Sequence, residues 1–284
     1  MPRWRVLSSS DQVGATQRWR LDLAYDGQAF NGFAFQPHRD TVVGLLRSTL
    51  ARTLRLDHEP VIVGAGRTDA GVHAYHQVVH VDLPSAAKVR SLDADRLRDS
   101  LNKQLRGRVQ ILSIGAVADE FHARFSATWR EYRYLVLEQN APGLDSTNAW
   151  AWSIAVPLDL VAMNRVALRL VGTHDFRAFC RRPANAPAGE PLLRRVISAQ
   201  WERLDDLWSM SPREAPALRL TIRAQSFCHN MVRCLVSAMV AVGAGALDGG
   251  EIDRRLVSGD RHQLPQPAPA GGLALVGVGY DALS

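Results

Sequence analysis

The sequence contains no long apolar run, although 46% of its 284 residues are hydrophobic. No segment approaches the ~20 consecutive apolar residues that a membrane-spanning helix needs. The N-terminal segment MPRWRVLSSSDQ is basic but lacks the apolar centre of a secretory signal peptide. We therefore expect a cytoplasmic protein with a proper core, arranged as one large domain or two domains of ordinary size.

Cysteine is scarce. The chain has three cysteines, Cys180, Cys228 and Cys234. An odd number without paired spacing argues against a disulfide framework, and Cys228 and Cys234 are too far apart for a CxxC zinc knuckle. We expect all three to be reduced and structural.

Signatures of nucleotide cofactors and metals are also missing, because the sequence has no GxGxxG, no GxxxxGK[ST] and no HExxH. Three histidines, His73, His76 and His80, stand close together, and the last two would share one strand face. A zinc-dependent hydrolase built on them is an alternative. The region offers no acidic ligand set and no helix, so we expect structural histidines, no metal and no cofactor.

Lysine is nearly absent. The only lysines are Lys88 and Lys103, and arginine supplies the rest of a formal net charge of +6. A basic balance favours a polyanionic partner, of which RNA or DNA is the obvious one. The arginine bias has a second interpretation, a GC-rich genome, and composition does not separate the two.

Hydrophobic periodicity predicts the same element order in each half of the chain. The first half has expected strands at 18–25, 61–63, 77–83 and 109–114 and expected helices at 41–54 and 93–104. The second half has expected strands at 132–137, 194–203, 217–224 and 274–278 and expected helices at 158–170, 230–242 and 249–258. Segments 181–193 and 205–216 are rich in Pro, Ala and charge and are expected to be mobile loops.

The predicted fold class is α+β. Each half would be a ferredoxin-like β-α-β-β-α-β unit with a mostly antiparallel sheet, and a cleft would lie between the halves. The expected divisions are a flexible N-terminal tail at 1–17, an N-terminal half at 18–117 and a C-terminal half at 118–284. The shared element order suggests a duplication.

The densest chemical signal is one glycine-rich segment, GAGRTDAGVHA, between two expected strands. Gly64, Gly66 and Gly71 permit tight or left-handed turns. Between them, Arg67 stands two residues from Asp69, and a nearby arginine keeps a carboxylate ionised. An ionised carboxylate on a rigid loop can act as a nucleophile. The alternative is that Asp69 only caps a turn through its own backbone.

Two further places carry unusual residues. Tyr132 and Tyr134 would share one strand face, as core residues or as groups that stack on unpaired nucleotides. Arg233 interrupts an expected helix that is apolar almost all round, near Asn230 and Ser237 on a polar stripe. A buried guanidinium needs a strong acceptor, and we expect it to pair with Asp69. The alternatives are an ordinary structural ion pair or an arginine that reaches solvent.

Taken together, these segments resemble the tRNA pseudouridine synthase A family over nearly the whole chain. The resemblance is carried by AYDGQAFNGF (24–33), TVVGLLRSTL (41–50), AGRTDAGVHAYHQVVHVD (65–82), FHARFSATWREYRYLV (121–136), GTHDFRAFC (172–180), FCHNMVRCLV (227–236) and APAGGLALVGVGYD (268–281). The GRTDAGVHA block is highly specific and occurs in order with the others.

The resemblance implies a homodimeric enzyme, free of cofactors, that converts uridine to pseudouridine at positions 38–40 of the tRNA anticodon stem-loop. Asp69 matches the family's catalytic aspartate, and Tyr132 matches the tyrosine that packs on the target base. Arg67 and Arg233 match basic residues around that aspartate. A non-catalytic RNA-binding protein of the same fold is the alternative, although the intact Asp69 argues against it.

The chain departs from the family pattern at a few positions. The run Phe33-Ala34-Phe35 replaces part of a usual Gly-Trp-Gln run, Arg47 replaces a usual Glu, and Ser237 replaces a usual Gly. These changes put packing details and RNA contacts in doubt, not the chemistry. For contacts to RNA phosphates, we expect Arg181 and Arg182 to contribute from the Pro-rich loop.

Overall fold

The computed structural model describes residues 16–84, 93–138, 150–181, 189–204, 217–262 and 264–280. The strands are β1 (Thr16–Tyr25), β2 (Ile62–Gly64), β3 (His73–Pro84), β4 (Val109–Ala116), β5 (Trp129–Glu138), β6 (Trp152–Ile154), β7 (Gly172–Asp175), β8 (Leu193–Leu204), β9 (Ala217–Ala224) and β10 (Leu273–Gly279). The helices are α1 (Val42–Leu54), α3 (Ala94–Leu105), α4 (Leu160–Arg169), α5 (Met231–Gly243) and α6 (Gly249–Ser258). Three short 3₁₀ turns are η1 (Gly27–Ala29), η2 (Arg177–Phe179) and η3 (Ala270–Gly272).

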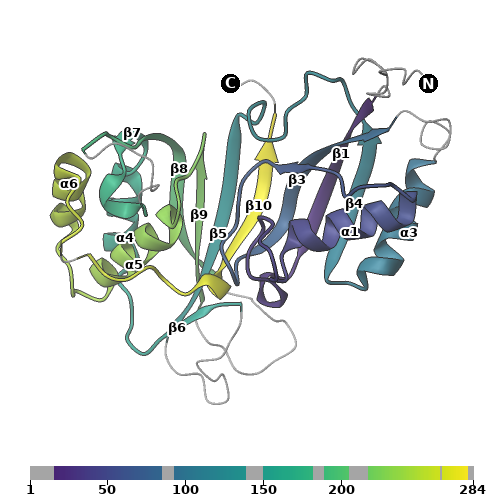
Figure 1. Ribbon diagram of the computed structural model, residues 1–284. Coiled ribbons are helices and arrows are strands. Elements are labelled where there is room, and N and C mark those ends of the chain that lie inside the picture. Colours follow the sequence, from purple (N-terminus) through teal and green to yellow (C-terminus); the bar gives the residue numbers. More distant parts are fainter. Residues whose placement is uncertain are drawn as a thin grey trace, which may run out of the picture.

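The strands form one mostly antiparallel ten-stranded sheet, so the fold is α+β as predicted. Its order is β4-β1-β3-β10-β5-β9-β8-β7, with β2 added to β3 and β6 added to β5. Helices α1 and α3 lie at one end of the sheet, and α4, α5 and α6 lie at the other (Figure 1).

The two halves of the chain meet at β10. This last strand pairs with β3 of the first half in parallel and with β5 of the second half in antiparallel. The buried core is continuous across this join, from Leu21 and Leu23 to Tyr132, Tyr134 and Leu275. The sheet therefore brings the β2–β3 loop, which carries the glycine-rich segment, next to the second half.

The helix starts follow from capping residues. Thr41 accepts a hydrogen bond from the backbone N–H of Gly44 at 3.1 Å, which confirms the predicted start of α1. Asp93 caps α3 in the same way. Helix α4 begins later than predicted because Asp159, rather than Leu158, is its N-cap residue.

The prediction that all three cysteines are reduced is wrong for one pair. Cys180 and Cys228 form a disulfide with their Cα atoms 5.8 Å apart, whereas Cys234 is free and buried. Sequence spacing could not reveal the pair, because the fold brings two distant segments together. The backbone N–H of Arg181 donates to the carbonyl of His229 at 2.9 Å, beside the disulfide.

Several predicted features fall outside the described part of the chain. These are most of the 1–17 tail, Arg182 with the segment 182–188 of the first Pro-rich loop, and the whole segment 205–216. Strands β6 and β7 were not predicted, because each is too short to show a periodic pattern. Within the described ranges, no helix combines the length and apolar composition needed to cross a bilayer.

Candidate functional site

The loop between β2 and β3 is held by hydrogen bonds along its length. The backbone N–H of Ala65 donates to Val78 at 2.8 Å, and the Gln77 amide donates to the Gly66 carbonyl at 2.9 Å. Deeper in the core, the hydroxyls of Tyr25 and Thr68 share a hydrogen bond of 2.8 Å. These contacts fix the backbone before Asp69, and the backbone N–H of Val72 donates to the Asp69 carbonyl at 3.1 Å on the other side.

The glycines of this loop have different structural roles. Gly71 is left-handed, with φ at 80°, as expected. Gly64 is needed for close approach, since a Cβ there would lie 2.4 Å from the Phe33 ring. Gly66 is not left-handed, and a Cβ on it would lie 3.9 Å from the Tyr132 hydroxyl. Of the three, only Gly71 therefore meets the expectation of a left-handed turn.

Asp69 is held through both of its carboxylate oxygens. Arg233 Nη1 lies 3.4 Å from Oδ2, which is the predicted pairing across the two halves. His229 Nε2 lies 3.2 Å from Oδ1, a contact that the sequence did not indicate. The Asp69 side chain is 30% exposed and the Arg233 side chain 19% exposed, so the pair is reachable from solvent.

Arg233 is fixed by further acceptors around it. Its Nε donates to the carbonyl of Ala268 at 2.7 Å, and its Nη1 also donates to Asn230 Oδ1 at 3.3 Å. Ser237, which was expected on the same polar stripe, donates instead to the backbone of Cys234. The guanidinium thus has acceptors from three segments, and this accounts for a charge on an otherwise buried helix.

Arg67 is an exposed residue of the loop. Among the described residues, the ion pairs of Asp69 go to His229 and Arg233, and none goes to Arg67. The charge that sequence reasoning assigned to Arg67 is therefore supplied by α5 and the residues before it. A catalytic role for Arg67 stays a prediction.

Tyr132 lies on β5 in the same region. Its ring is buried and packs edge-on against Phe227, with 5.2 Å between ring centroids. Burial raises the pKa of Tyr132, and the nearby Tyr25 and the negative charge of Asp69 raise it further. The side chain is a neutral phenol at neutral pH, so it presents an aromatic ring and an O–H group rather than a phenolate base.

Arg130 was missed by sequence reasoning as a site residue. It is only 7% exposed and donates to four backbone carbonyls. One of these belongs to Ala65 in the Asp69 loop, and another, that of Gln225, belongs to the second half, at 2.7 Å. The available signal was its place two residues before Tyr132, on the buried face of the strand.

The three histidines considered for zinc have separate partners. His73 Nδ1 accepts from the backbone N–H of Gly27 at 3.1 Å, and His76 Nε2 lies 3.0 Å from Asp22. His80 Nδ1 accepts from the backbone N–H of Ala123 at 3.0 Å. In the described part of the chain, no group of three or more His, Cys, Asp or Glu side chains is placed to hold a metal ion.

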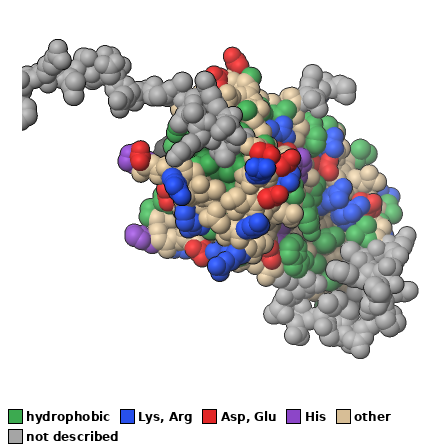
Figure 2. Space-filling model, turned by 90° about the vertical axis from the view of Figure 1, so that its right-hand side faces the viewer, with side chains coloured by type: hydrophobic (Ala, Val, Ile, Leu, Met, Phe, Trp, Pro, Cys, Tyr) green, Lys and Arg blue, Asp and Glu red, His purple; other side chains and the backbone are tan. Residues whose placement is uncertain are grey.

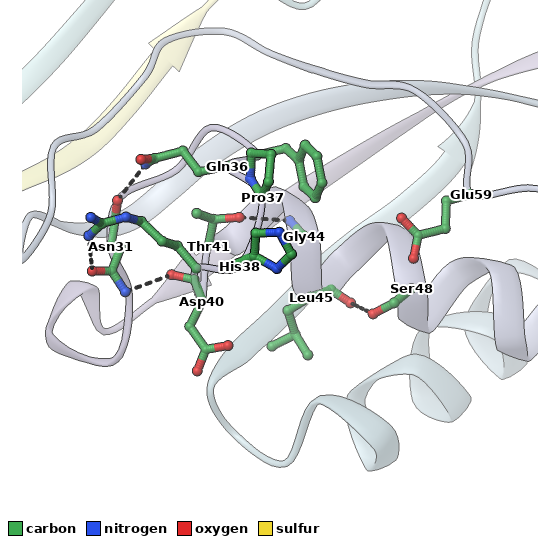
Figure 3. A pocket seen from close by; sticks show the side chains of 12 residues that line it. Asn31, Gln36, Pro37, His38, Asp40, Thr41, Gly44, Leu45, Ser48 and Glu59 are labelled. Carbon is green, nitrogen blue, oxygen red and sulfur yellow. Dashed lines mark hydrogen bonds between the residues drawn. The ribbon is translucent and has the colours of Figure 1, made fainter.

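A hollow of about 850 Å³ lies beside the N-terminal end of α1 (Figure 3). It is lined by residues 31, 35–41, 44, 45, 48 and 59. Asp69 does not line it. Phe33 belongs to the chain segment that lines the hollow, and its backbone N–H donates to the carbonyl of Thr68, next to Asp69, at 3.0 Å. The hollow is therefore a neighbour of the Asp69 loop, not part of the Asp69 site.

Comparisons with known proteins agree with one another. Residues 23–126 and 166–281 match a family described as tRNA pseudouridine synthase. A tRNA pseudouridine synthase A of Cutibacterium acnes is 38% identical over 265 residues, which cover 93% of this chain and 89% of that protein. Proteins of the same name from Maricaulis maris and Frankia casuarinae are 38% and 41% identical, over 93% of this chain and 98% and 89% of their own lengths.

Proposed function

The chain belongs to the tRNA pseudouridine synthase family, and on that premise we propose that it isomerises uridine to pseudouridine in the anticodon stem-loop of tRNA, at positions 38–40. The observation that carries this proposal is the Asp69 carboxylate, which lies between His229 and Arg233 beside the buried ring of Tyr132. The reaction moves the base from N1 to C5 attachment at C1′. It needs neither a redox step nor an energy source.

In the proposed mechanism Asp69 is the nucleophile. Its carboxylate either adds to C6 of the base or assists loss of the base at C1′, after which the base turns and rejoins through C5. Arg233 orients the carboxylate through its contact with Oδ2. Arg67, exposed in the same loop, is proposed as a second basic residue of the catalytic site.

The target uridine must leave its stack to reach Asp69, at a cost of a few kcal/mol. Stacking on the Tyr132 ring would return ~1 to 3 kcal/mol of that cost. Removal of the C5 proton at the end of the reaction is proposed for Tyr132 or for a water molecule.

Contacts to the rest of the tRNA are proposed for arginines near the site. Arg181 is exposed, and its backbone N–H donates a hydrogen bond to the carbonyl of His229. It therefore lies at the edge of the Asp69 region. Arg182 follows it in the chain. On the face shown in Figure 2, which is the right-hand side of the view in Figure 1, basic side chains are interspersed with acidic ones.

The remaining family properties are proposed in the same way. We propose a cytoplasmic homodimer that uses no cofactor. The halves 18–117 and 118–284 would be ferredoxin-like repeats, preceded by a tail at 1–17. The strand orders β4-β1-β3-β2 and β10-β5-β9-β8 support this, because corresponding strands occupy corresponding places. A cleft between the halves at Asp69 is part of this proposal.

The test is tritium release from tRNA that carries 5-tritiated uridine, followed by mapping of pseudouridine in the product. The wild-type chain should release tritium and modify positions 38–40. Asp69→Asn should be folded yet release none, because an amide is not an anionic nucleophile. Asn activity within tenfold of wild type, or modification confined to other positions, would overturn the assignment.

A further inference from the structure

We propose that His229 is a positioning residue for Asp69 and that the Cys180–Cys228 disulfide holds His229 in place. The inference rests on the proposed function, because it concerns how the nucleophile is aimed. It starts from the contact of 3.2 Å between His229 Nε2 and Asp69 Oδ1. It then follows the chain outward from His229 to the disulfide.

A carboxylate with one anchored oxygen still turns about its last torsion, because χ2 of aspartate is a broad, two-fold rotor. Arg233 anchors Oδ2 of Asp69 at 3.4 Å, and His229 anchors Oδ1. Two partners on different oxygens fix the plane of the carboxylate. Attack at a single carbon of the target nucleotide needs such a fixed plane, since reacting atoms must be aligned as well as close.

The segment that carries His229 is not held by regular secondary structure. Helix α5 begins after it, and Asn230 between them is left-handed with φ at 64°, a conformation that is uncommon for residues other than glycine. Because the His229 side chain is 46% exposed, packing alone does not fix it. Its direction therefore depends on how the backbone at 228–230 is restrained.

Two restraints tie that backbone to the segment after η2. Cys228 is crosslinked to Cys180, and the backbone N–H of Arg181 donates to the carbonyl of His229. The crosslink thus stands one residue from the side chain that contacts Asp69. Disulfides in cytosolic enzymes are usually transient and redox-sensing, so a pair at this place gives redox state a route to the nucleophile.

The Cys180–Cys228 disulfide can be reduced by thiol–disulfide exchange. Dithiothreitol, a dithiol, attacks the disulfide twice and leaves as its cyclic disulfide, while Cys180 and Cys228 each gain a proton and become thiols. The two electrons come from the reductant, and no other reactant is needed. The product has the same side chains around Asp69 but a less restrained His229.

The first experiment compares His229→Gln with His229→Met in tritium release. The Gln amide nitrogen replaces Nε2 as a donor, whereas Met has none. His229→Met should lower kcat roughly 10- to 100-fold with KM for tRNA little changed, as expected for losing a hydrogen bond to a charged group. His229→Gln should recover most of that loss. Equal kcat values for the two variants would overturn the donor role.

The matched control is His58→Met, because His58 is an exposed histidine in the α1–β2 connection. It should leave kcat and KM unchanged. Thermal melting of each variant separates a loss of fold from a loss of alignment. A His229→Met variant that melts like wild type and keeps full kcat would also overturn the proposal.

The second experiment tests the crosslink. Reduction of the wild type, or the double change Cys180→Ser with Cys228→Ser, should lower kcat by about threefold or more. The same treatment should lower kcat further by less than twofold in His229→Met, because both changes act through one contact. The role of the disulfide would be overturned if reduction lowered kcat by the same factor in His229→Met as in the wild type. It would also be overturned if reduction left the kcat of the wild type unchanged.

A third measurement does not depend on activity. The ring-nitrogen NMR signals of His229 should shift in Asp69→Asn and after reduction, whereas those of His58 should stay unchanged. Wild-type protein without tritium release would refute the proposed function, yet these shifts would still test the contact. Unchanged His229 signals would overturn the positioning role even in an active enzyme.

Discussion

Arg233 and Asp69 lie on different halves of the chain, and 3.4 Å separates Nη1 of the arginine from Oδ2 of the aspartate. The arginine stands on a helix whose other residues are nearly all buried, and the aspartate stands on a loop between two strands of the first half. The pair therefore links the packing of α5 to the position of the Asp69 carboxylate, the proposed nucleophile.

The link predicts a coupling energy. Arg233→Met alone should destabilise the fold by about 1–3 kcal/mol, below the full value for a buried pair because both side chains keep some solvent contact. Asp69→Leu with Arg233→Met should cost less than the sum of the single changes, by about 0.5–3 kcal/mol. Urea unfolding of the four proteins measures this, and simple additivity would refute the coupling.

Arg130 should contribute strongly to stability. Arg130→Met would leave four backbone carbonyls without their donor, so we expect a loss of about 2–4 kcal/mol. Arg130→Lys should not restore it, because one ammonium group cannot reproduce the planar fork of the guanidinium. Thermal and urea unfolding distinguish this from a mild surface effect, for which Arg96→Met on exposed α3 is the control.

Binding of tRNA should depend steeply on salt, and Arg181 should account for part of that dependence. Arg181→Ala is expected to reduce the slope of log K against log salt by about one, as the loss of a single phosphate contact does. Arg96→Ala carries the same charge change on α3 and should leave the slope as it is. Filter binding between 50 and 200 mM salt measures the slope for both variants. A wild-type affinity that does not change with salt would contradict the phosphate contacts.

His80 should make stability fall in mild acid. Burial, with Arg18 and His122 nearby, lowers the pKa of His80 from 6.5 to about 4. Between these values the unfolded chain binds a proton that the folded chain does not, so unfolding becomes easier as pH drops through this window, by at most about 3 kcal/mol.

The variant His80→Asn keeps an acceptor for the backbone N–H of Ala123 but does not titrate. Urea unfolding at pH 7 and at pH 4.5 should show a larger loss for the wild type than for the variant. If both proteins lose the same stability over this range, other groups dominate the acid response.

Most helices and strands could be predicted from local sequence patterns. Thr41 and Asp93 mark helix starts because a capping oxygen acts on its own helix, and the predicted strands follow from alternation along the chain. The single sheet was harder to predict. Whether two halves stack or join depends on the pairing of β10 with β3, and strand pairing between distant segments leaves no local pattern.

At the site, the Asp69–Arg233 contact was predictable because a charge in an apolar helix demands a partner. The contact of His229 with Asp69 was not predictable, since an exposed histidine next to a helix start does not require a charged partner. The Cys180–Cys228 disulfide was hidden for a similar reason, because nothing in either local sequence records that the other lies nearby. A contact can be predicted from the sequence when a buried charged group requires a partner. A contact that forms only because the fold brings two exposed or distant residues together cannot be predicted in this way.

The place of β10 at the centre of the sheet has a consequence for how the protein is made. β10 follows both of its partner strands in the chain, so before it is made the His73–Ala74 stretch of β3 lacks its β10 partner. Because contacts so distant in sequence form slowly, we expect this join, and with it the Asp69 site, to form late in folding. We therefore expect a chain that stops before β10 to be inactive, because the Asp69 loop and β5 would lack the strand that joins them.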